Sequence, residues 1–183
     1  MKTASWRCGH CIKNPPPFTE THACFVYDPL LAHLIHGLKF AGRLQVVPFF
    51  VEEMMLCLKR AYKGRTLPSV LIPVPLQYSR QFKRGFNQAH EIGRRVATAL
   101  GCSYEPHLVR KRKSTRAQAT LNKEARLRNV LGCFEVVGKW QGGSVALIDD
   151  VMTTGSTLSE LAHTLQRAGA TEIHVWVMAR ARL

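Results

Sequence analysis

One segment near the end of the chain limits the possible folds more than any other. Residues 145–148 are uniformly apolar, two acids and a Thr/Gly-rich loop follow, residues 157–168 have helical spacing, and residues 173–178 form a second apolar run. A short apolar run bounded by turn residues is typical of a strand buried on both faces, as in parallel sheets. The segment therefore predicts a strand–helix–strand unit. The expected fold class is α/β, with a central, mostly parallel sheet flanked by helices.

The rest of the chain continues this alternation. Asp28 and Pro29 have the residue types of a helix start, and apolar residues at helical spacing continue to Leu38. The other expected elements are a helix over 46–62, a strand over 69–74, a helix over 87–100 that ends at Gly101, a weaker strand over 104–109 and a strand over 133–137. Residues 1–27, which contain three consecutive prolines, are expected to form a separate loop-like stretch and connector. Residues 28–183 would then form the main domain.

Composition excludes some classes of protein and leaves others open. No run of 18 apolar residues exists, which excludes a membrane-spanning protein, and the N-terminus lacks an apolar signal region, so we expect a cytoplasmic location. The net charge is +14, and residues 80–128 alone carry 13 basic and 3 acidic residues. Such local basicity favours binding of phosphate esters, pyrophosphate or nucleic acid. A solvated basic surface is the alternative explanation.

The loop after the apolar run at 145–148 has the residues needed to bind a phosphorylated sugar. Backbone amides at a helix start bind anions, and a glycine lets the backbone approach the ligand. The adjacent carboxylates would repel phosphate but can accept hydrogen bonds from two neighbouring hydroxyls. The phosphate-binding candidates are Thr153, Thr154, Gly155, Ser156 and Thr157, and the hydroxyl-binding candidates are Asp149 and Asp150. An ordinary strand-to-helix turn explains one acid and one glycine but not the whole set.

This loop resembles the 5-phosphoribosyl-1-pyrophosphate (PRPP) motif of type I phosphoribosyltransferases. Over nearly the whole chain, the sequence resembles the ComF/GntX family of competence- and DNA-utilisation-associated proteins. The segments that carry this resemblance are 13–18 (KNPPPF), 34–40 (LIHGLKF), 72–76 (IPVPL), 84–89 (RGFNQA), and Thr115, Gln118, Leu121, Arg126 and Asn129. The resemblance implies a type I phosphoribosyltransferase core with a helical hood at about residues 28–66, and a role in natural competence, DNA uptake or DNA utilisation.

The resemblance also implies a reaction and the residues that serve it. Phosphoribosyl would pass from PRPP to an unidentified acceptor with release of pyrophosphate, and Mg²⁺ would accompany PRPP. By position, the pyrophosphate-binding residues are Arg80, Lys83 and Arg84, and the catalytic candidates are Arg84, Lys111 and Arg116, the last two in a loop at about 110–123 that would close over the site. Cationic partners would stabilise the departing pyrophosphate. A homodimer is expected by analogy with the family.

A second hypothesis assigns the basic residues to nucleic acid. Lys111, Arg112, Lys113 and Arg116 would grip the phosphates of single-stranded DNA, and the PRPP pocket would be a sensor or a remnant. Salt-dependent DNA binding favours this hypothesis, whereas PRPP-dependent pyrophosphate release favours the enzyme.

The N-terminal cysteines form half of a zinc site. Cys8 and Cys11 have the Cys-x2-Cys spacing, but a structural zinc site needs four ligands. The family resemblance implies a four-cysteine N-terminal module, of which this chain retains one pair. His10, His22 or Cys24 are the candidates to complete the site, and exposed thiols without metal are the alternative.

Overall fold

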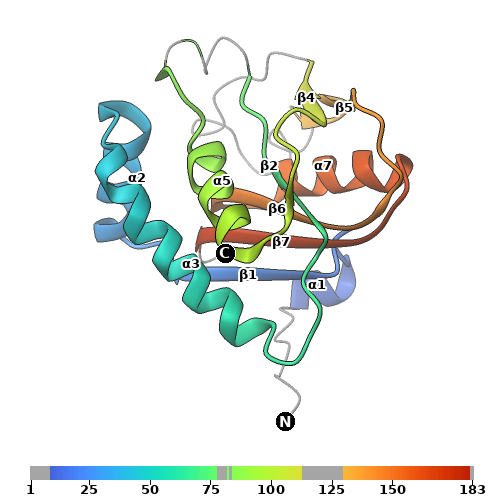
Figure 1. Ribbon diagram of the computed structural model, residues 1–183, viewed down its shortest axis with the longest axis horizontal. Coiled ribbons are helices and arrows are strands. Elements are labelled where there is room, and N and C mark those ends of the chain that lie inside the picture. The colour runs from blue at the N-terminus through green and yellow to red at the C-terminus, as the bar shows by residue number, and fades with distance from the viewer. Residues whose placement is uncertain (1–8, 78–81, 83, 113–129, 182–183) are drawn as a thin grey trace.

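Parallel strands form the centre of the fold. The computed structural model describes residues 9–77, 82, 84–112 and 130–181 (Figure 1). Five parallel strands pair in the order β1-β7-β6-β2-β3, and two further strands, β4 and β5, form an antiparallel pair. Their bounds are β1 Glu20–Val26, β2 Val70–Pro73, β3 Ser103–Tyr104, β4 Val109–Lys111, β5 Phe134–Val136, β6 Gly143–Met152 and β7 Ala170–Arg180. The predicted α/β class with a parallel sheet is confirmed.

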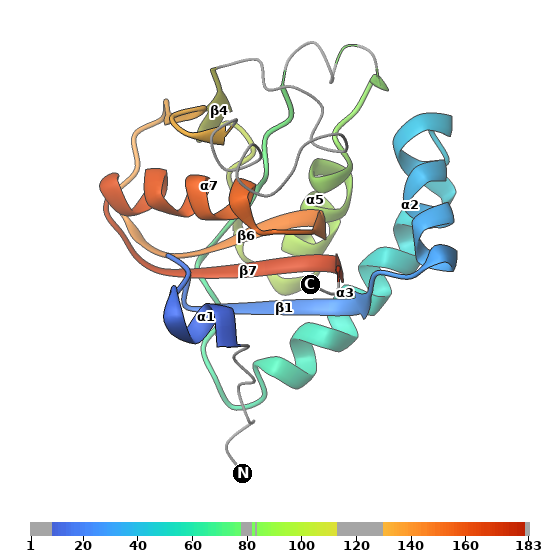
Figure 2. The same ribbon diagram turned by 180° about the vertical axis from the view of Figure 1, so that it is seen from behind.

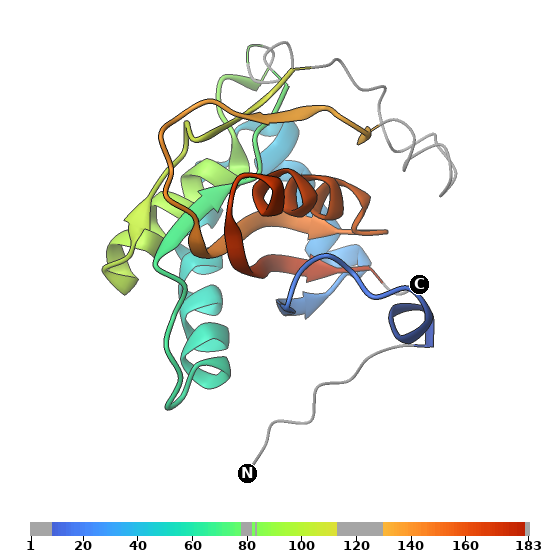
Figure 3. The same ribbon diagram turned by 90° about the vertical axis from the view of Figure 1, so that its right-hand side faces the viewer.

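Helices cover both faces of the sheet. Their bounds are α1 Gly9–Lys13, α2 Pro29–Ala41, a 3-10 helix at Leu44–Val46, α3 Val47–Ala61, α5 Gln88–Leu100 and α7 Ser156–Arg167. Alternate residues of β6 enter two separate cores: Ala146 and Ile148 pack with residues of α3 and α5, whereas Val145 and Leu147 pack with residues of α7. Since side chains alternate across a strand, α3 and α5 cover one face and α7 covers the other (Figures 2 and 3).

The expected helix boundaries follow from local chemistry. The Asp28 carboxylate accepts a hydrogen bond from the Leu31 amide at 2.7 Å, and Pro29 occupies the first helical position of α2. Helix α5 begins after Asn87, whose side chain accepts from the Ala89 amide at 3.0 Å. It ends at Gly101, where φ is 68°, a left-handed value that glycine adopts without strain.

Two sequence predictions are wrong. Residues 20–26 are not loop-like but form strand β1, which pairs in parallel with β7 at the edge of the sheet. Six of its seven residues are half-buried, so the strand lacks the alternation of buried and exposed residues that would reveal it. The strand expected over 104–109 is instead divided between β3 and β4, because Pro106 cannot donate to a ladder and a turn follows it.

No helix in the described part of the chain is both long enough and apolar enough to cross a membrane.

Candidate functional site

Strand β6 carries two acids to the carboxyl end of the sheet. The Asp150 side chain is buried, with 7% of the residue exposed, and Asp149 is half-buried. The Asp150 amide donates to Asp149 Oδ1 at 2.9 Å, which fixes the position of that carboxylate. Ligands of open α/β sheets bind at the carboxyl ends of the strands. The two acids therefore lie where this architecture places its ligand.

The loop between β6 and α7 is shaped for close backbone approach. Gly155 has φ 80°, and a Cβ at this position would lie 2.6 Å from Met152 Cε. The hydroxyls of Thr154 and Ser156 are 2.8 Å apart. Gly155 provides no side-chain cap for α7, and the Ser156 amide lies 3.4 Å from Thr154 Oγ1. Backbone amides at a helix start are a general site for anions.

A lysine from the N-terminal helices reaches the acids. Lys39 lies near the end of α2, and its Nζ is 2.9 Å from Asp150 Oδ1 and 2.8 Å from Oδ2. The next residue, Phe40, has the guanidinium of Arg84 above its ring at 5.1 Å. Arg84 Nη1 also donates to Gln88 Oε1 at 3.3 Å. The end of α2 thus contacts both an acid of β6 and a cation of the loop before α5.

The loop between β2 and α5 meets the β6 loop because β2 and β6 are neighbouring strands. Asn87 links the two ends of this loop: its Nδ2 donates to the Val74 carbonyl at 3.0 Å, and its Oδ1 caps α5. The side chain of Gln88 is buried beside it. Because Arg84 contacts Phe40 and the preceding residue Lys39 contacts Asp150, Arg84 lies at the same edge of the sheet as Asp150.

The charges of this edge are unevenly balanced. Burial raises the pKa of Asp149 to about 7, and repulsion from Asp150 adds to the increase. The positive charges of Lys39 and Lys111 oppose it but do not cancel it. The two carboxylates are therefore not fully neutralised by nearby positive charges. A ligand can stabilise them with a hydrogen bond from a hydroxyl group or with a bound cation.

The comparisons with known proteins agree with this geometry. Residues 69–182 match the family described as phosphoribosyl transferase domain. The DNA utilization protein YhgH of Salmonella typhi is 33% identical over 175 residues, which cover 94% of this chain and 77% of that protein. Competence protein F of Haemophilus influenzae is 32% identical over 179 residues, which cover 95% of this chain and 78% of that protein.

The chain belongs to the ComF/GntX family. Its domain has the type I phosphoribosyltransferase fold, as the resemblance predicted. Among solved structures, adenine phosphoribosyltransferase of Saccharomyces cerevisiae superimposes with a TM-score of 0.47 at 16% identity, covering 75% of this chain and 69% of that one.

The structure brings most of the candidates of this ComF/GntX protein to one edge. Asp149 and Asp150 lie near the end of β6, residues 153–157 follow as the loop and the first residues of α7, and Arg84 lies at the same edge. The predicted residues Arg80, Lys83, Lys113, Arg116 and Cys8 lie outside the described residues. Cys11 lies on α1, at the start of the described chain.

Two other candidates lie at the end of β4, Lys111 as its last residue and Arg112 directly after it, and they differ in their surroundings. Lys111 places its Nζ 5.5 Å from the centre of the Phe134 ring, and its charge is felt at Asp149. Arg112 lies with its Nε 2.9 Å from Glu135 Oε2, and Arg110 pairs with the same carboxylate. Lys111 is therefore electrostatically part of the acidic edge, whereas Arg112 has an acidic partner of its own.

Sequence reasoning missed two residues of this site. From the sequence we assigned no role to Lys39, although it lies in the segment 34–40 that supports the family resemblance. Arg180, in the last strand, donates from Nη1 to the carbonyls of Met152 and Thr153, the former at 3.0 Å. By holding these carbonyls, Arg180 orients the start of the loop between β6 and α7. Neither residue has a local sequence signal, because each acts through a contact distant along the chain.

Proposed function

We propose that this protein binds PRPP at the carboxyl edge of β6. The 5′-phosphate would lie on the amides and hydroxyls of residues 153–157, and the ribose hydroxyls would donate to Asp149 and Asp150. The pyrophosphate would face the cations of the β2–α5 loop, Arg80, Lys83 and Arg84. The observation that carries this assignment is the adjacent carboxylate pair near the end of β6, followed by the glycine N-cap of α7.

The proposed reaction is the transfer of phosphoribosyl to an acceptor. The bond between the anomeric carbon and a pyrophosphate oxygen breaks, and pyrophosphate leaves with the electron pair. A lone pair of the acceptor, by class a nitrogen, forms the new bond, and the acceptor releases its proton to solvent. Arg84, Lys111 and Arg116 would stabilise the departing charge. Asp149 and Asp150 position the ribose, and neither is assigned as a nucleophile.

The donor set at this edge fits Mg²⁺, which prefers oxygen ligands. Two adjacent carboxylates carry two negative charges against the single ammonium of Lys39 when both are ionised. Asp149 and Asp150 would hold the ion, directly or through water. When bound together with PRPP, Mg²⁺ supplies neutralisation of the pyrophosphate charge.

The relatives are named for competence and for DNA utilization, and we place the reaction in the uptake or use of DNA. The alternative, a protein that grips single-stranded DNA through its basic residues, has less support on β4. Glu135 lies between Arg110 and Arg112, and a carboxylate there repels phosphate. The charge of Lys111 acts instead on Asp149, inside the proposed pocket.

Isothermal titration calorimetry with PRPP and Mg²⁺ tests the proposal. The Asp149→Ala/Asp150→Ala double variant should bind PRPP at least about tenfold more weakly than the parent, because two charged hydrogen-bond acceptors are lost. The matched control Glu52→Ala removes an exposed carboxylate of α3 and should bind as the parent does. Equal affinities in the double variant and the parent would discard the assignment. Strong, salt-dependent oligonucleotide binding without PRPP binding would support the DNA-gripping alternative instead.

A further inference from the structure

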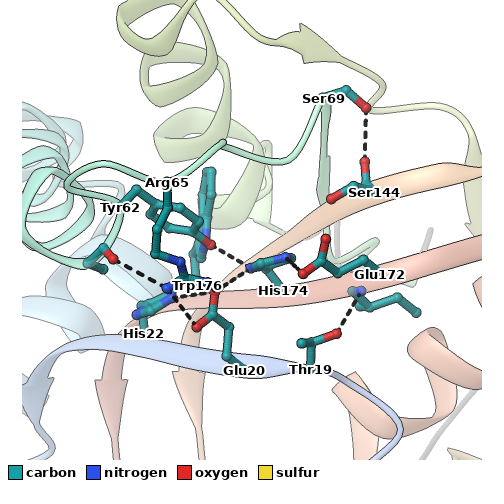
Figure 4. A network of polar contacts seen from close by, with 12 residues as sticks. Thr19, Glu20, His22, Tyr62, Arg65, Ser69, Ser144, Glu172, His174 and Trp176 are labelled. Carbon is teal, nitrogen blue, oxygen red and sulfur yellow. Dashed lines mark hydrogen bonds and ion pairs between the residues drawn. The ribbon is translucent and has the colours of Figure 1, made fainter. Parts of the chain in front are cut away.

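A second polar cluster lies at the opposite end of the sheet, where the strands begin. Glu20 and His22 stand two residues apart on β1, so their side chains share one face. His174 on β7 is the register partner of Glu20. Figure 4 shows the three side chains converging below Tyr62, which follows α3. This cluster takes no part in the proposed PRPP site.

The atoms that converge are all of metal-ligating types. Glu20 Oε1 lies 3.3 Å from His22 Nε2 and 2.7 Å from His174 Nδ1. One ligand atom from each residue lies within 4.8 Å of the other two. Two ligands of tetrahedral Zn²⁺, each bonded at about 2.0–2.2 Å, are roughly 3.3 Å apart. The two separations from Glu20 Oε1 are at or below this value, and the ligand atoms of His22 and His174 lie within 4.8 Å of each other.

Nδ1 of His174 faces both the meeting point and the hydroxyl of Tyr62. Trp176 Nε1 donates to Tyr62 Oη at 3.1 Å, and Tyr62 Oη lies 2.7 Å from His174 Nδ1. An unprotonated Nδ1 has one lone pair, so the tyrosine hydroxyl and an ion would compete for it. On the far side of the ring, Glu172 Oε1 is 3.1 Å from Nε2. A carboxylate beside the second ring nitrogen is the arrangement that orients metal-binding histidines.

Two buried nitrogen atoms of the cluster lack a well-formed hydrogen bond. Among the described residues, His22 Nε2 and His174 Nε2 make no hydrogen bond of ordinary geometry, and the carboxylate oxygens that they face, of Glu20 and Glu172, lie at 3.3 and 3.1 Å. Buried nitrogen atoms without partners are costly. His174 Nδ1 and Glu20 Oε1, which are 2.7 Å apart, must have either a proton or a metal ion between them. A cation at the meeting point would satisfy this pair and the His22 nitrogen together.

We propose that Glu20, His22 and His174 form a binding site for a divalent transition metal, Zn²⁺ by donor type, with water in the fourth position. The ion would join β1 to β7 and fasten the N-terminal strand to the sheet.

Arg65 would compete with the ion for the carboxylate of Glu20. Its guanidinium contacts Glu20 Oε1 at 2.7 Å and Oε2 at 3.2 Å, and its side chain is 42% exposed. An exposed arginine can swing into solvent when a metal takes its carboxylate. Arg65 and Tyr62 also line a cavity of about 700 Å³, so the site has an approach for the ion on this side. Removal of Arg65 should therefore tighten metal binding.

The test is titration of Zn²⁺ by calorimetry and of Co²⁺ by visible absorption, in a Cys8→Ser/Cys11→Ser background that removes the half-site of the N-terminus. The parent background should bind one ion with the visible bands of a low-coordinate nitrogen and oxygen site. His22→Ala should weaken binding by more than about 100-fold. His163→Ala, which removes an exposed histidine of α7, is the matched control and should change nothing.

Arg65→Gln should tighten Zn²⁺ binding, because the guanidinium no longer competes with the ion for Glu20. The absence of stoichiometric binding by the background protein would overturn the proposal. So would an equal loss in His22→Ala and His163→Ala. If His22→Ala fails to fold, His22→Gln replaces it, and the cobalt spectrum of the background protein gives an answer without any variant of the cluster. Unchanged or weaker binding by Arg65→Gln would contradict the role of Glu20 as a ligand.

Discussion

Asp149 should make this protein less stable as the pH rises through neutrality. Its pKa in the folded chain is raised to about 7 by burial and by Asp150, against an ordinary value of 3.8. The folded state therefore holds a proton that the unfolded state releases. The stability contributed by this proton is fully present below pH 3.8 and is lost as the pH rises through about 7. Asp149→Asn removes the titration and should remove this loss.

The size of the effect follows from the two pKa values. Each unit between the pH and the higher pKa is worth about 1.4 kcal/mol while the unfolded carboxyl stays ionised. At about pH 5 the folded chain keeps nearly the whole contribution of two such units, and at about pH 8 it keeps almost none. The free energy of unfolding of the parent should thus fall by about 2.5 kcal/mol relative to Asp149→Asn across this range.

Urea denaturation of both proteins at several pH values between about 5 and 8 measures this difference. Other groups titrate in the same way in both chains, including Glu20, whose pKa is lowered to about 2 despite its partial burial, mainly by its hydrogen bond to Arg65. Their contributions cancel in the comparison. Glu52→Gln, at an exposed carboxylate, should track the parent at every pH. A stability difference between Asp149→Asn and the parent that does not vary with pH would refute the reasoning.

Three further substitutions test the contacts of the site by denaturation and by PRPP titration. Lys39→Met leaves the buried Asp150 carboxylate without its ammonium partner and should destabilise the fold by about 3 kcal/mol. Gly155→Ala places a Cβ at φ 80°, 2.6 Å from a mobile methyl of Met152, and should cost about 1–2 kcal/mol and weaken PRPP binding. Asn87→Ala loses both the helix cap and the bond to β2 and should cost about 1–2 kcal/mol, with no effect on metal binding at Glu20. Unchanged melting of any of the three would contradict the contact that it removes.

The parts of the fold that could be predicted from the sequence are those set by neighbouring residues. Asp28 and Asn87 cap helices through amides within three residues of themselves. The strand–helix–strand unit of β6, α7 and β7 is formed by one continuous segment of the chain. Strand β1 could not be predicted, because its place depends on pairing with β7, about 150 residues later. An edge strand of half-buried residues has no internal pattern to show this partner.

The candidate site also contains residues that could be predicted from their sequence neighbours and residues that depend on distant contacts. The acids and the Thr/Gly loop are adjacent in sequence. Once a strand is expected before them, their residue types predict a site for a phosphorylated sugar. Lys39 pairs with Asp150 across 111 positions, and Arg180 reaches the Met152 carbonyl across 28. A charged side chain on a helix is normally a solvated one, so nothing local distinguishes Lys39 from the other lysines of the chain.

The end of α2 links the two parts of the proposed site, the acids of β6 and the arginine before α5. Ribose hydroxyls that donate to Asp150 compete with Lys39 for the same two oxygens, so binding of PRPP must loosen this ion pair or share it. The residue after Lys39 holds the guanidinium of Arg84, which we assign to pyrophosphate. A shift of Lys39 on its helix therefore also moves the ring under Arg84. The ribose and pyrophosphate ends of one ligand would be coupled through two consecutive residues of α2, and the position of this helix would report whether the site is filled.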